Sequence, residues 1–388
     1  MSSYCICSAF YLPHMGGVER FTDNLALELV RQGHSVTIVT NDTYDIGLHE
    51  ILSSGVEVYR LPCIAALYGR FPIPKKNKVF RRALAELNAR SFDGILINTR
   101  FYPHTLIALR FAKRIGVTPI VLDHGSAYLT FGNPVFDVFA HTYEHAITML
   151  VKKYSPLFYG ISQKSVEWLE VFGITAKGVI SNSINSIEYR GQASNRSFRD
   201  ELGIDNGRML LAFTGRLIPE KGIDTLLGMM ELLQDEPVDL VIAGEGPLRT
   251  HIEKSGLKHL HLVGRLGQPD IAALLLEADL FCLPTRSEGF STSLLESAAC
   301  GTPFLVTNVG GARELAPSRD YGFVVKSADS KVFAEKVLFA LKEDVDLEAM
   351  GALCRSRVED KYSVSSVVTT LIDAFSVSSA PNASHQMN

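Results

Sequence analysis

The feature that most constrains the fold of this chain is an alternation of two patterns along its whole length. Short apolar runs, each bounded by Gly, Pro, Asn or Asp, alternate with longer stretches in which apolar residues recur at helical spacing. This order predicts α/β domains, each a parallel sheet covered by helices, and excludes β-sandwiches and helix bundles. This alternation is interrupted by the polar stretch 185–208, which we interpret as a linker, and resumes after it. We therefore predict two doubly wound domains in series.

The predicted strands divide between the two parts of the chain. In the first part they are residues 4–10, 35–40, 56–61, 94–98, 119–123, 157–161 and 178–181. In the second part they are residues 209–214, 239–243, 261–263, 280–283, 304–307 and 322–325. The corresponding domains are predicted at 1–185 and 186–361, followed by a helix and a flexible tail at 362–388. A length of 388 residues also favours more than one domain.

The composition is that of a globular protein, with 46% hydrophobic and 21% charged residues, and excludes a disordered, collagenous or coiled-coil chain. No apolar run approaches the roughly 18 residues that span a bilayer, and the first residues lack the basic segment of a signal peptide. The six cysteines are scattered, and Cys5 and Cys7 have no second pair at zinc-ligand spacing. We expect buried, reduced thiols, a cytoplasmic protein and no nucleic-acid partner.

Charge is divided unevenly along the chain. Residues before Asn185 include 18 basic and 14 acidic side chains, and the rest include 20 basic and 28 acidic ones. Five of the basic residues crowd into 75–82, beside an apolar stripe at helical spacing: Lys75, Lys76, Lys78, Arg81 and Arg82. This segment either lies on an anionic membrane, which would make the protein peripheral on the inner face of the cytoplasmic membrane, or is a solvated helix whose stripe faces the core. The second alternative is the commoner one.

The strongest local motif follows the predicted strand 280–283. A polar loop contains Glu288, and Ser291 and Thr292 precede a helix that carries Glu296. Open α/β sheets bind ligands at the carboxyl ends of their strands. Ser291 or Thr292 is expected to cap the helix, so that free N–H groups and the positive end of the helix dipole face an anion such as diphosphate. The two carboxylates suit sugar hydroxyls, although Glu296 is alternatively an exposed helical carboxylate.

A second constellation follows the predicted strand 209–214, where Gly215 and Arg216 are followed by Lys221 and Gly222. Arginine grips phosphate with two bonds, whereas lysine acts as a movable point charge. Together they would neutralise a diphosphate without a metal ion. The alternative is two solvated cations in a loop.

In the first part, Gly16 and Gly17 follow the first strand, and His124 ends the strand 119–123. Adjacent glycines allow the backbone to approach a ligand closely, but they are also ordinary in strand-to-helix loops. His124 is either a hydrogen-bond partner of a sugar hydroxyl or a capping or core histidine.

In combination, these motifs resemble the retaining GT-B glycosyltransferases of glycosyltransferase family 4. The matching segments, in family order, are 16–19, 215–222, 244–248, 263–264 and 288–303. They cover nearly the whole chain. The most specific element is the pair Glu288 and Glu296 with Arg216 and Lys221 upstream.

The resemblance implies two Rossmann-like domains that face each other across a cleft, and transfer of a sugar from a UDP-, GDP- or ADP-linked donor to an acceptor hydroxyl with retention. It implies that Arg216 and Lys221 hold the diphosphate, that Glu296 binds the ribose and that Glu288 binds the donor sugar. It places the terminal helix 362–375 back on the first domain. The further donor-site residues that it implies are Gly16, Gly17, Gly215, Val263, Gly264, Phe290, Ser291 and Thr292, with His124 near the sugar.

The implied acceptor is a glycan, a lipid-linked saccharide or a small molecule, within polysaccharide, cell-envelope glycan or glycolipid biosynthesis. No cofactor or metal is expected, and no acidic pair of the DxD type lies near the donor loops. Two alternatives stay open: a GT-B isomerase or epimerase of nucleotide sugars, and a nucleotide-sugar-binding protein without turnover. The four charged residues Arg216, Lys221, Glu288 and Glu296 weigh against the binding protein, which does not need all the charges that stabilise a leaving group.

Overall fold

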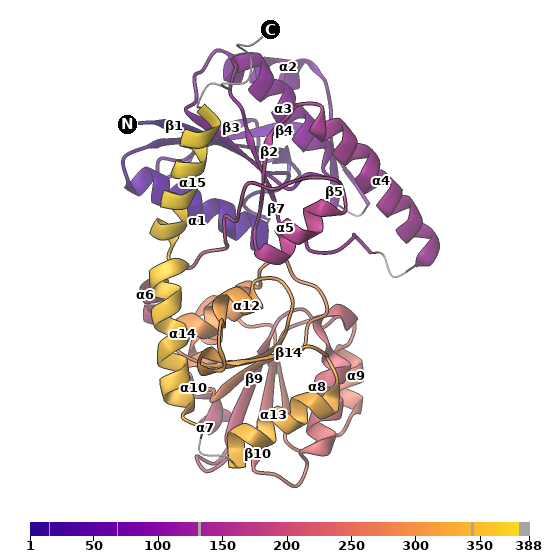
Figure 1. The fold of residues 1–388 in the computed structure, drawn as a ribbon, viewed down its shortest axis with the longest axis vertical. Helices are drawn as coiled ribbons and strands as arrows, with labels where there is room; N and C mark the ends of the chain where they lie inside the picture. The colour runs from indigo at the N-terminus through magenta and orange to yellow at the C-terminus, as the bar shows by residue number, and fades with distance from the viewer. Residues whose placement is uncertain (15, 68, 131–132, 343–344, 380–388) are drawn as a thin grey trace. The chain divides into compact units, whose positions relative to one another are not determined.

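A computed structural model describes residues 1–14, 16–67, 69–130, 133–342 and 345–379. The chain divides into an N-terminal unit, residues 1–181 with the segment from Val364, and a C-terminal unit, residues 182–363. Each unit contains a mainly parallel sheet with helices on both faces (Figure 1). The two predicted Rossmann-like domains are confirmed.

The N-terminal unit is built on an eight-stranded sheet. Its strands are β1 (Ser3–Cys7), β2 (Ser35–Asp42), β3 (His49–Ile51), β4 (Glu57–Ala66), β5 (Phe71–Pro74), β6 (Gly94–Asn98), β7 (Ile120–Asp123) and β8 (Leu157–Gly160). Its helices are α1 (Gly17–Arg31), α2 (Lys78–Asn88), α3 (Pro103–Ile115), α4 (Pro134–Lys152), α5 (Gln163–Glu170) and α15 (Val364–Ser379). The parallel strands run in the order β4-β2-β1-β6-β7-β8, so the strand order reverses between β1 and β6. Ligands bind at such a reversal in doubly wound sheets.

Three features of this sheet differ from the prediction. The strands β3 and β5 were not expected, and both pair antiparallel with β4. β5 has the sequence Phe-Pro-Ile-Pro, in which two residues cannot donate a ladder hydrogen bond, so it carries no ordinary strand signal and lies at an edge. The predicted strand 178–181 is wrong, because this segment forms only an isolated bridge between Gly160 and Val179.

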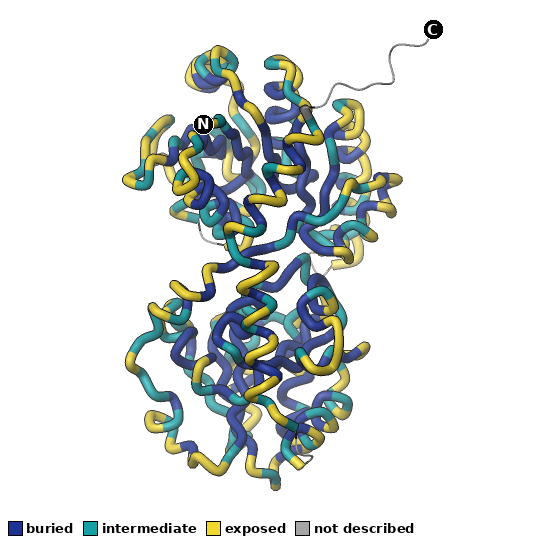
Figure 2. The backbone as a smooth tube through the Cα atoms, turned by 60° about the vertical axis from the view of Figure 1, so that its left-hand side comes forward, coloured by how far each residue is buried: buried dark blue, intermediate teal, exposed yellow. Residues whose placement is uncertain are grey.

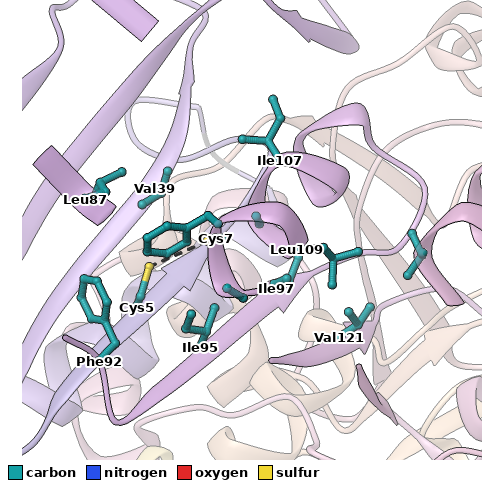
Figure 3. Packing of buried hydrophobic residues seen from close by; sticks show 14 of the residues in the cluster. Cys5, Cys7, Val39, Leu87, Phe92, Ile95, Ile97, Ile107, Leu109 and Val121 are labelled. Carbon is teal, nitrogen blue, oxygen red and sulfur yellow. Dashed lines mark hydrogen bonds between the residues drawn. The ribbon is translucent and has the colours of Figure 1, made fainter. Parts of the chain in front are cut away.

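Side chains from β1 and β6 pack under α2 and α3 in the core of the N-terminal unit (Figure 3). Cys5 and Cys7 lie side by side there, with their Sγ atoms 3.8 Å apart. All six cysteines are free, and all except the partly exposed Cys63 are buried. The expectation of buried thiols is confirmed for five of the six, with Cys63 as the exception.

The helix α2 decides between the two interpretations of the basic segment 75–82. Its apolar stripe consists of Val79, Phe80, Ala83, Leu84 and Leu87. Phe80, Ala83 and Leu87 are at most 5% exposed and belong to the core, Leu84 packs against that core, and Val79 is 45% exposed. Most of the stripe is therefore not available to lipid, and it faces the core as the commoner alternative expects. The five cations of the segment remain exposed.

The C-terminal unit has a six-stranded parallel sheet in the order β11-β10-β9-β12-β13-β14. Its strands are β9 (Met209–Thr214), β10 (Val238–Ala243), β11 (Leu260–Gly264), β12 (Leu280–Leu283), β13 (Phe304–Thr307) and β14 (Phe323–Val325). Its helices are α6 (Ser186–Gly191), α7 (Phe198–Leu202), η1 (Pro219–Lys221), α8 (Ile223–Leu232), α9 (Arg249–Lys254), α10 (Gln268–Glu277), α11 (Thr292–Cys300), α12 (Ala312–Leu315), η2 (Arg319–Tyr321), α13 (Ser330–Lys342) and α14 (Leu347–Lys361). The strand order reverses between β9 and β12. Figure 2 shows that dark blue, buried backbone is concentrated in the interior of each unit.

The predicted linker 185–208 is not a structureless connection. It contains α6 and α7, and α6 packs against α10, α11 and α14 of the C-terminal unit. At the other end of this unit, α15 starts at Val364 and packs on α1 within the N-terminal unit, where the rings of Phe375 and Tyr4 stack 5.2 Å apart. None of the helices in the described ranges combines the length and apolarity needed to span a bilayer.

Candidate functional site

The candidate site of the C-terminal unit lies at the carboxyl ends of β9 and β12, the two neighbouring strands at which the sheet order reverses. The loop after β9 carries Arg216 and Lys221, and the loop after β12 carries Glu288. Loops at this position in a doubly wound sheet surround the ligand-binding crevice. The fold thus brings together two predicted segments that are separated by 67 positions in the sequence.

An ion pair joins these two loops. The Nζ atom of Lys221 donates to Oε1 of Glu288, and both side chains are about five-sixths buried, with 17% and 16% exposed. Arg216, in contrast, is exposed at the start of the same loop. The loop therefore presents one cation that is already oriented by a carboxylate and one that extends into solvent.

Backbone contacts hold the Lys221 loop against the end of β12. The carbonyl oxygen of Glu220 accepts from the backbone N–H of Arg286 (2.8 Å) and from the hydroxyl of Thr285 (3.1 Å). Gly222 has a positive φ of 74°, and a Cβ atom there would overlap the carbonyl oxygen of Pro284. Only glycine fits both conditions. Thr285, which is 1% exposed, was not identified from the sequence.

The helix α11 starts directly after the Glu288 loop. Ser291 is its N-cap, and the Ser291 hydroxyl accepts from the backbone N–H of Leu294 at 3.3 Å. The Ser291 and Ser293 hydroxyls are 3.0 Å apart. Thr292 is the first helical residue, so its N–H belongs to the group that has no acceptor within the helix. The start of α11 therefore has the geometry and the dipole of an anion site.

The burial of two further predicted residues is informative. Glu296, one turn inside α11, is 6% exposed, so the alternative of an exposed helical carboxylate is wrong. Phe290 is also 6% exposed, its carbonyl accepts from Asn182 at 3.3 Å, and its ring packs on Tyr362. Phe290 therefore fixes the loop through its side chain and carbonyl rather than lining open space.

Val263 and Gly264 end β11, two strands away from β9. The carbonyl oxygen of Gly264 accepts from the N–H of Gly244 at 2.8 Å, and Gly215 donates to Ala243 at 3.0 Å. The carboxyl end of β10 thus links Val263 and Gly264 to the loop that carries Arg216 and Lys221.

In the N-terminal unit, the predicted residues gather around the first turn of α1. Gly16 is the N-cap and Gly17 the first residue of this helix. A Cβ atom at Gly16 would lie 2.5 Å from Oε2 of Glu19, the end of a flexible side chain that is able to shift. His124 follows β7, and its ring lies 5.2 Å from the ring of Phe21 in α1. The structure therefore places His124 beside the helix that the two glycines begin.

A chain of hydrogen bonds fixes the orientation and tautomer of His124. The Thr22 hydroxyl donates to the carbonyl oxygen of Val18 (2.8 Å), and the Asn98 amide N–H donates to Thr22 (2.8 Å). The Asn98 carbonyl oxygen therefore faces Nε2 of His124, 2.9 Å away, and accepts a hydrogen bond from the Nε2–H group. Burial lowers the pKa of His124 to about 3. The ring is thus neutral at pH 7, with Nδ1 as its hydrogen-bond acceptor. Neither Asn98 nor Thr22 lies in a motif that would have identified it from the sequence.

We expect Asn98→Asp to raise the pKa of His124 toward its ordinary range. A carboxylate beside Nε2 favours the imidazolium, whereas the amide carbonyl carries no net charge. NMR titration of the histidine ring, assigned with His124→Gln, measures the change. The control is Asn88→Asp at the end of α2, which adds the same charge away from this chain. An unchanged titration in Asn98→Asp would contradict the hydrogen-bond assignment.

A buried ionic cluster lies beside His124. Arg100 pairs with Glu144 of α4 (3.0 Å) and with Asp123 (3.5 Å), and all three side chains are at most 1% exposed. The Arg100 guanidinium also lies over the ring of Phe172, 3.9 Å from its centroid. Burial raises the pKa of Asp123 to about 6, while Arg100 opposes the shift and Glu144 adds to it. The cluster anchors the end of β7 and was not predicted.

These observations define what each unit is able to bind. In the C-terminal unit, a cation loop and a capped helix start suit an anion, and two glutamates lie at the same edge of the sheet. In the described part of the chain, no group of three or more His, Cys, Asp or Glu side chains is placed to hold a metal ion. In the N-terminal unit, a neutral histidine is held at the carboxyl edge of the sheet.

Comparisons with known proteins agree with this arrangement. The model of "Glycosyltransferase Family 4" matches residues 15–186, and the model of "Glycosyl transferases group 1" matches residues 194–356. One component of human phosphatidylinositol N-acetylglucosaminyltransferase is 26% identical over 87% of this chain and 69% of its own length. An uncharacterised glycosyltransferase of Methanocaldococcus jannaschii is 24% identical over 92% of this chain and 94% of its own length.

Solved structures share the fold. Sucrose-phosphate synthase from Thermosynechococcus elongatus superposes with a TM-score of 0.74 at 17% identity, covering 97% of this chain and 99% of that one. HepE of Anabaena, solved in complex with UDP and glucose, superposes with a TM-score of 0.72 at 16% identity, covering 97% and 100%. With both halves of the chain matched by family models and both sheets in place, the chain belongs to glycosyltransferase family 4 and is a glycosyltransferase of GT-B fold.

Proposed function

We propose that this glycosyltransferase moves a sugar from a nucleotide-diphosphate donor to an acceptor hydroxyl with retention at the anomeric carbon. The observation that carries the proposal is the Lys221–Glu288 pair at the strand reversal, directly before the capped start of α11. A cation and a helix amino terminus suit the diphosphate, and a carboxylate suits sugar hydroxyls. The HepE structures with UDP and with UDP-glucose, which have the same fold, support a donor of this class.

In the proposed reaction, the bond between the anomeric carbon and the diphosphate oxygen breaks, and its electron pair leaves with the diphosphate. The acceptor oxygen bonds to the same face of the sugar, and its proton passes to the leaving phosphate. Arg216, Lys221 and the α11 dipole stabilise the negative charge that grows on the diphosphate. No metal ion is needed for this role, and Glu296 and Glu288 bind the ribose and the sugar. His124, kept neutral by burial and oriented by Asn98, accepts a hydrogen bond from a donor-sugar hydroxyl.

The N-terminal unit is the proposed acceptor side. A cavity of about 310 Å³ opens at the carboxyl ends of β1, β2 and β4, lined by Phe10, His14, Tyr44 and Arg70 among others. Its aromatic rings suit the faces of a sugar, and Arg70 suits a phosphate or another anion on the acceptor. We propose a lipid-linked saccharide or a glycan as acceptor. The relatives support an acceptor of this kind, since the name of the human one specifies phosphatidylinositol.

A screen of UDP-, GDP- and ADP-sugars by thermal shift tests the donor. A ligand at 100 times its dissociation constant stabilises the protein by about 2.7 kcal/mol. NMR of the reaction mixture then follows the anomeric proton, and we expect the same configuration in donor and product. Inversion would overturn the retaining mechanism. Epimerisation of the donor without an acceptor would identify an isomerase, and stabilisation without turnover would identify a binding protein.

We expect Glu296→Gln to weaken binding of the free nucleoside diphosphate about 10- to 100-fold, because a charge-assisted hydrogen bond to the ribose contributes about 1.5–3 kcal/mol. Glu288→Gln should leave that affinity unchanged and instead lower kcat/KM for the sugar donor. Calorimetry with the nucleotide identified by the screen distinguishes the two. Glu335→Gln, on the exposed face of α13, is the control. Wild-type affinity in Glu296→Gln would refute the ribose assignment.

A further inference from the structure

The segment 288–290, which carries Glu288 and leads into α11, is closely packed along its backbone. Gly310, in the loop after β13, has a positive φ of 51°. A Cβ atom at Gly310 would lie 2.7 Å from the carbonyl oxygen of Gly289 and 3.0 Å from that of Glu288. A glycine is therefore required at this position, and it lets the loop after β13 lie directly against the 288–290 segment.

Phe290, the last residue of this segment, is held through both its ring and its carbonyl oxygen. A Cβ atom at Gly311 would lie 2.2 Å from the ring, and the ring of Tyr362 packs on it with the centroids 5.4 Å apart. The Asn182 amide N–H donates to the Phe290 carbonyl oxygen at 3.3 Å, and the Asn182 carbonyl oxygen accepts from the N–H of Ser183 at 2.9 Å. The Phe290, Asn182 and Tyr362 side chains are buried, so water does not compete for these contacts.

Asn182 and Tyr362 lie at the two places where the chain passes from one unit to the other. The C-terminal unit comprises residues 182–363, so Asn182 is its first residue and Tyr362 its last but one. We call residues 182–184 and 362–363 the crossover segments. They are joined by a hydrogen bond from the N–H of Ile184 to the carbonyl oxygen of Tyr362 at 2.9 Å. The helices next to them, α6 and α14, contact each other and α11 within the C-terminal unit (Figure 1).

We infer that Asn182 and Tyr362 are positioning residues which act through Phe290 and make the position of Glu288 depend on both crossover segments. Phe290 is two residues from Glu288, and the backbone between them is packed on Gly310, so a shift of Phe290 also moves Glu288. A displacement of about 1 Å in a positioning group costs up to about 100-fold in rate. The inference rests on the proposed function in one respect, namely that Glu288 binds the donor sugar.

Kinetics of two variants of the full-length protein test the inference. Asn182→Asp keeps the size of the side chain and the acceptor for Ser183, but it replaces the donor to Phe290 with an oxygen. Tyr362→Leu removes the ring and keeps apolar bulk. We expect both to lower kcat/KM for the sugar donor about 10- to 100-fold, while the affinity for the free nucleoside diphosphate stays within about twofold. The affinity is retained because the ribose ligand Glu296 lies inside α11. Tyr362→Phe, which keeps the ring, should restore kcat/KM.

A double variant and two controls separate positioning from a general loss of structure. If Asn182 acts through Glu288, Asn182→Asp should slow the Glu288→Gln enzyme by no more than about twofold, because the two effects are not additive. Asn185→Asp adds the same charge at the exposed N-cap of α6, where Asp caps as well as Asn. Tyr321→Leu removes a ring of the same size from η2. Both controls should keep the wild-type kcat/KM.

Amide hydrogen exchange of the protein without ligand tests the same contacts independently of the reaction. Peptides that cover residues 285–292 should exchange at least about tenfold faster in Asn182→Asp and Tyr362→Leu, and at the wild-type rate in Asn185→Asp. Unchanged exchange, additive effects in the double variant or an equal loss of nucleotide affinity would each overturn the inference.

The failure of this inference is distinguishable from the failure of the proposed function. A wild-type protein that transfers no sugar from any nucleotide sugar would refute the proposed function, and hydrogen exchange would still show whether Asn182 and Tyr362 hold the 288–290 segment. An active enzyme whose exchange and kcat/KM are the same in wild type and Asn182→Asp would refute the inference alone.

Discussion

Replacing Lys221 with Ala is expected to lower kcat by about 10²- to 10³-fold, with a much smaller change in the affinity for the sugar donor. The reason is that the ammonium group interacts best with a diphosphate whose negative charge has grown on leaving. Interactions made mainly in the transition state affect kcat rather than KM. Arg216→Ala should act in the same direction. Steady-state kinetics with the donor identified by the thermal-shift screen measures both parameters.

The ion pair between Lys221 and Glu288 allows a second test of this prediction. Removal of Lys221 also leaves the largely buried Glu288 carboxylate without its ammonium partner, which costs stability for reasons unrelated to the reaction. The double variant Lys221→Ala with Glu288→Gln removes that cost. If Lys221 acts on the leaving group, the double variant regains thermal stability and remains slow.

The control for Lys221 is Lys342→Ala. Lys342 also forms an ion pair with a glutamate, Glu236, in the C-terminal unit, but at an exposed position on α13. Its loss should leave kcat unchanged. A Lys221→Ala variant with wild-type kcat and a raised KM would show that the residue contributes only uniform binding, and the leaving-group role would be wrong.

The parts of this site that could be predicted from the sequence are the local ones. Ser291 and Glu296 are positioned by their spacing from one helix start, and the strand before them is a continuous apolar run. The pairing of Lys221 with Glu288 depends on β9 and β12 being neighbours in the sheet, although β10 and β11 come between them in the chain. Strand order is a property of the whole sheet, and no local pattern encodes it.

The same reason explains what was missed in the N-terminal unit. Asn98 and Thr22 are 76 positions apart and meet because α1 packs over the end of β6. A single asparagine at a strand end produces no periodic signal. The apolar stripe of α2 showed that this helix packs on something, but whether the partner is a core or a membrane depends on its neighbours. The exposure of apolar positions in α4 could not be predicted from the sequence either, because the hydrophobicity of residues along a helix does not reveal which face the sheet covers.

The largest effect on stability is expected from Arg100→Met. Arg100 is the cation of a fully buried cluster with Asp123 and Glu144, and its guanidinium lies on the Phe172 ring. Removing one member of a buried ion pair costs about 3–5 kcal/mol, because it leaves uncompensated charge in a medium of low dielectric constant. Two carboxylates lose their partner here. Urea unfolding followed by Trp168 fluorescence reports on this region, since its ring lies 5.4 Å from that of Phe172.

The dependence on pH separates this electrostatic cause from lost packing. Burial already raises the pKa of Asp123 to about 6, above its unfolded value, and loss of the opposing Arg100 charge raises it further. A carboxyl whose folded pKa is raised binds a proton more readily in the folded state, so folding is favoured as pH falls through that pKa. The stability deficit of Arg100→Met should therefore shrink when the pH is lowered from about 8 to about 5. Arg110→Met, on the exposed face of α3, should change stability by no more than about 1 kcal/mol at either pH. A deficit in Arg100→Met that is the same at both pH values would show that Arg100 acts through its contact with Phe172 and not through its charge.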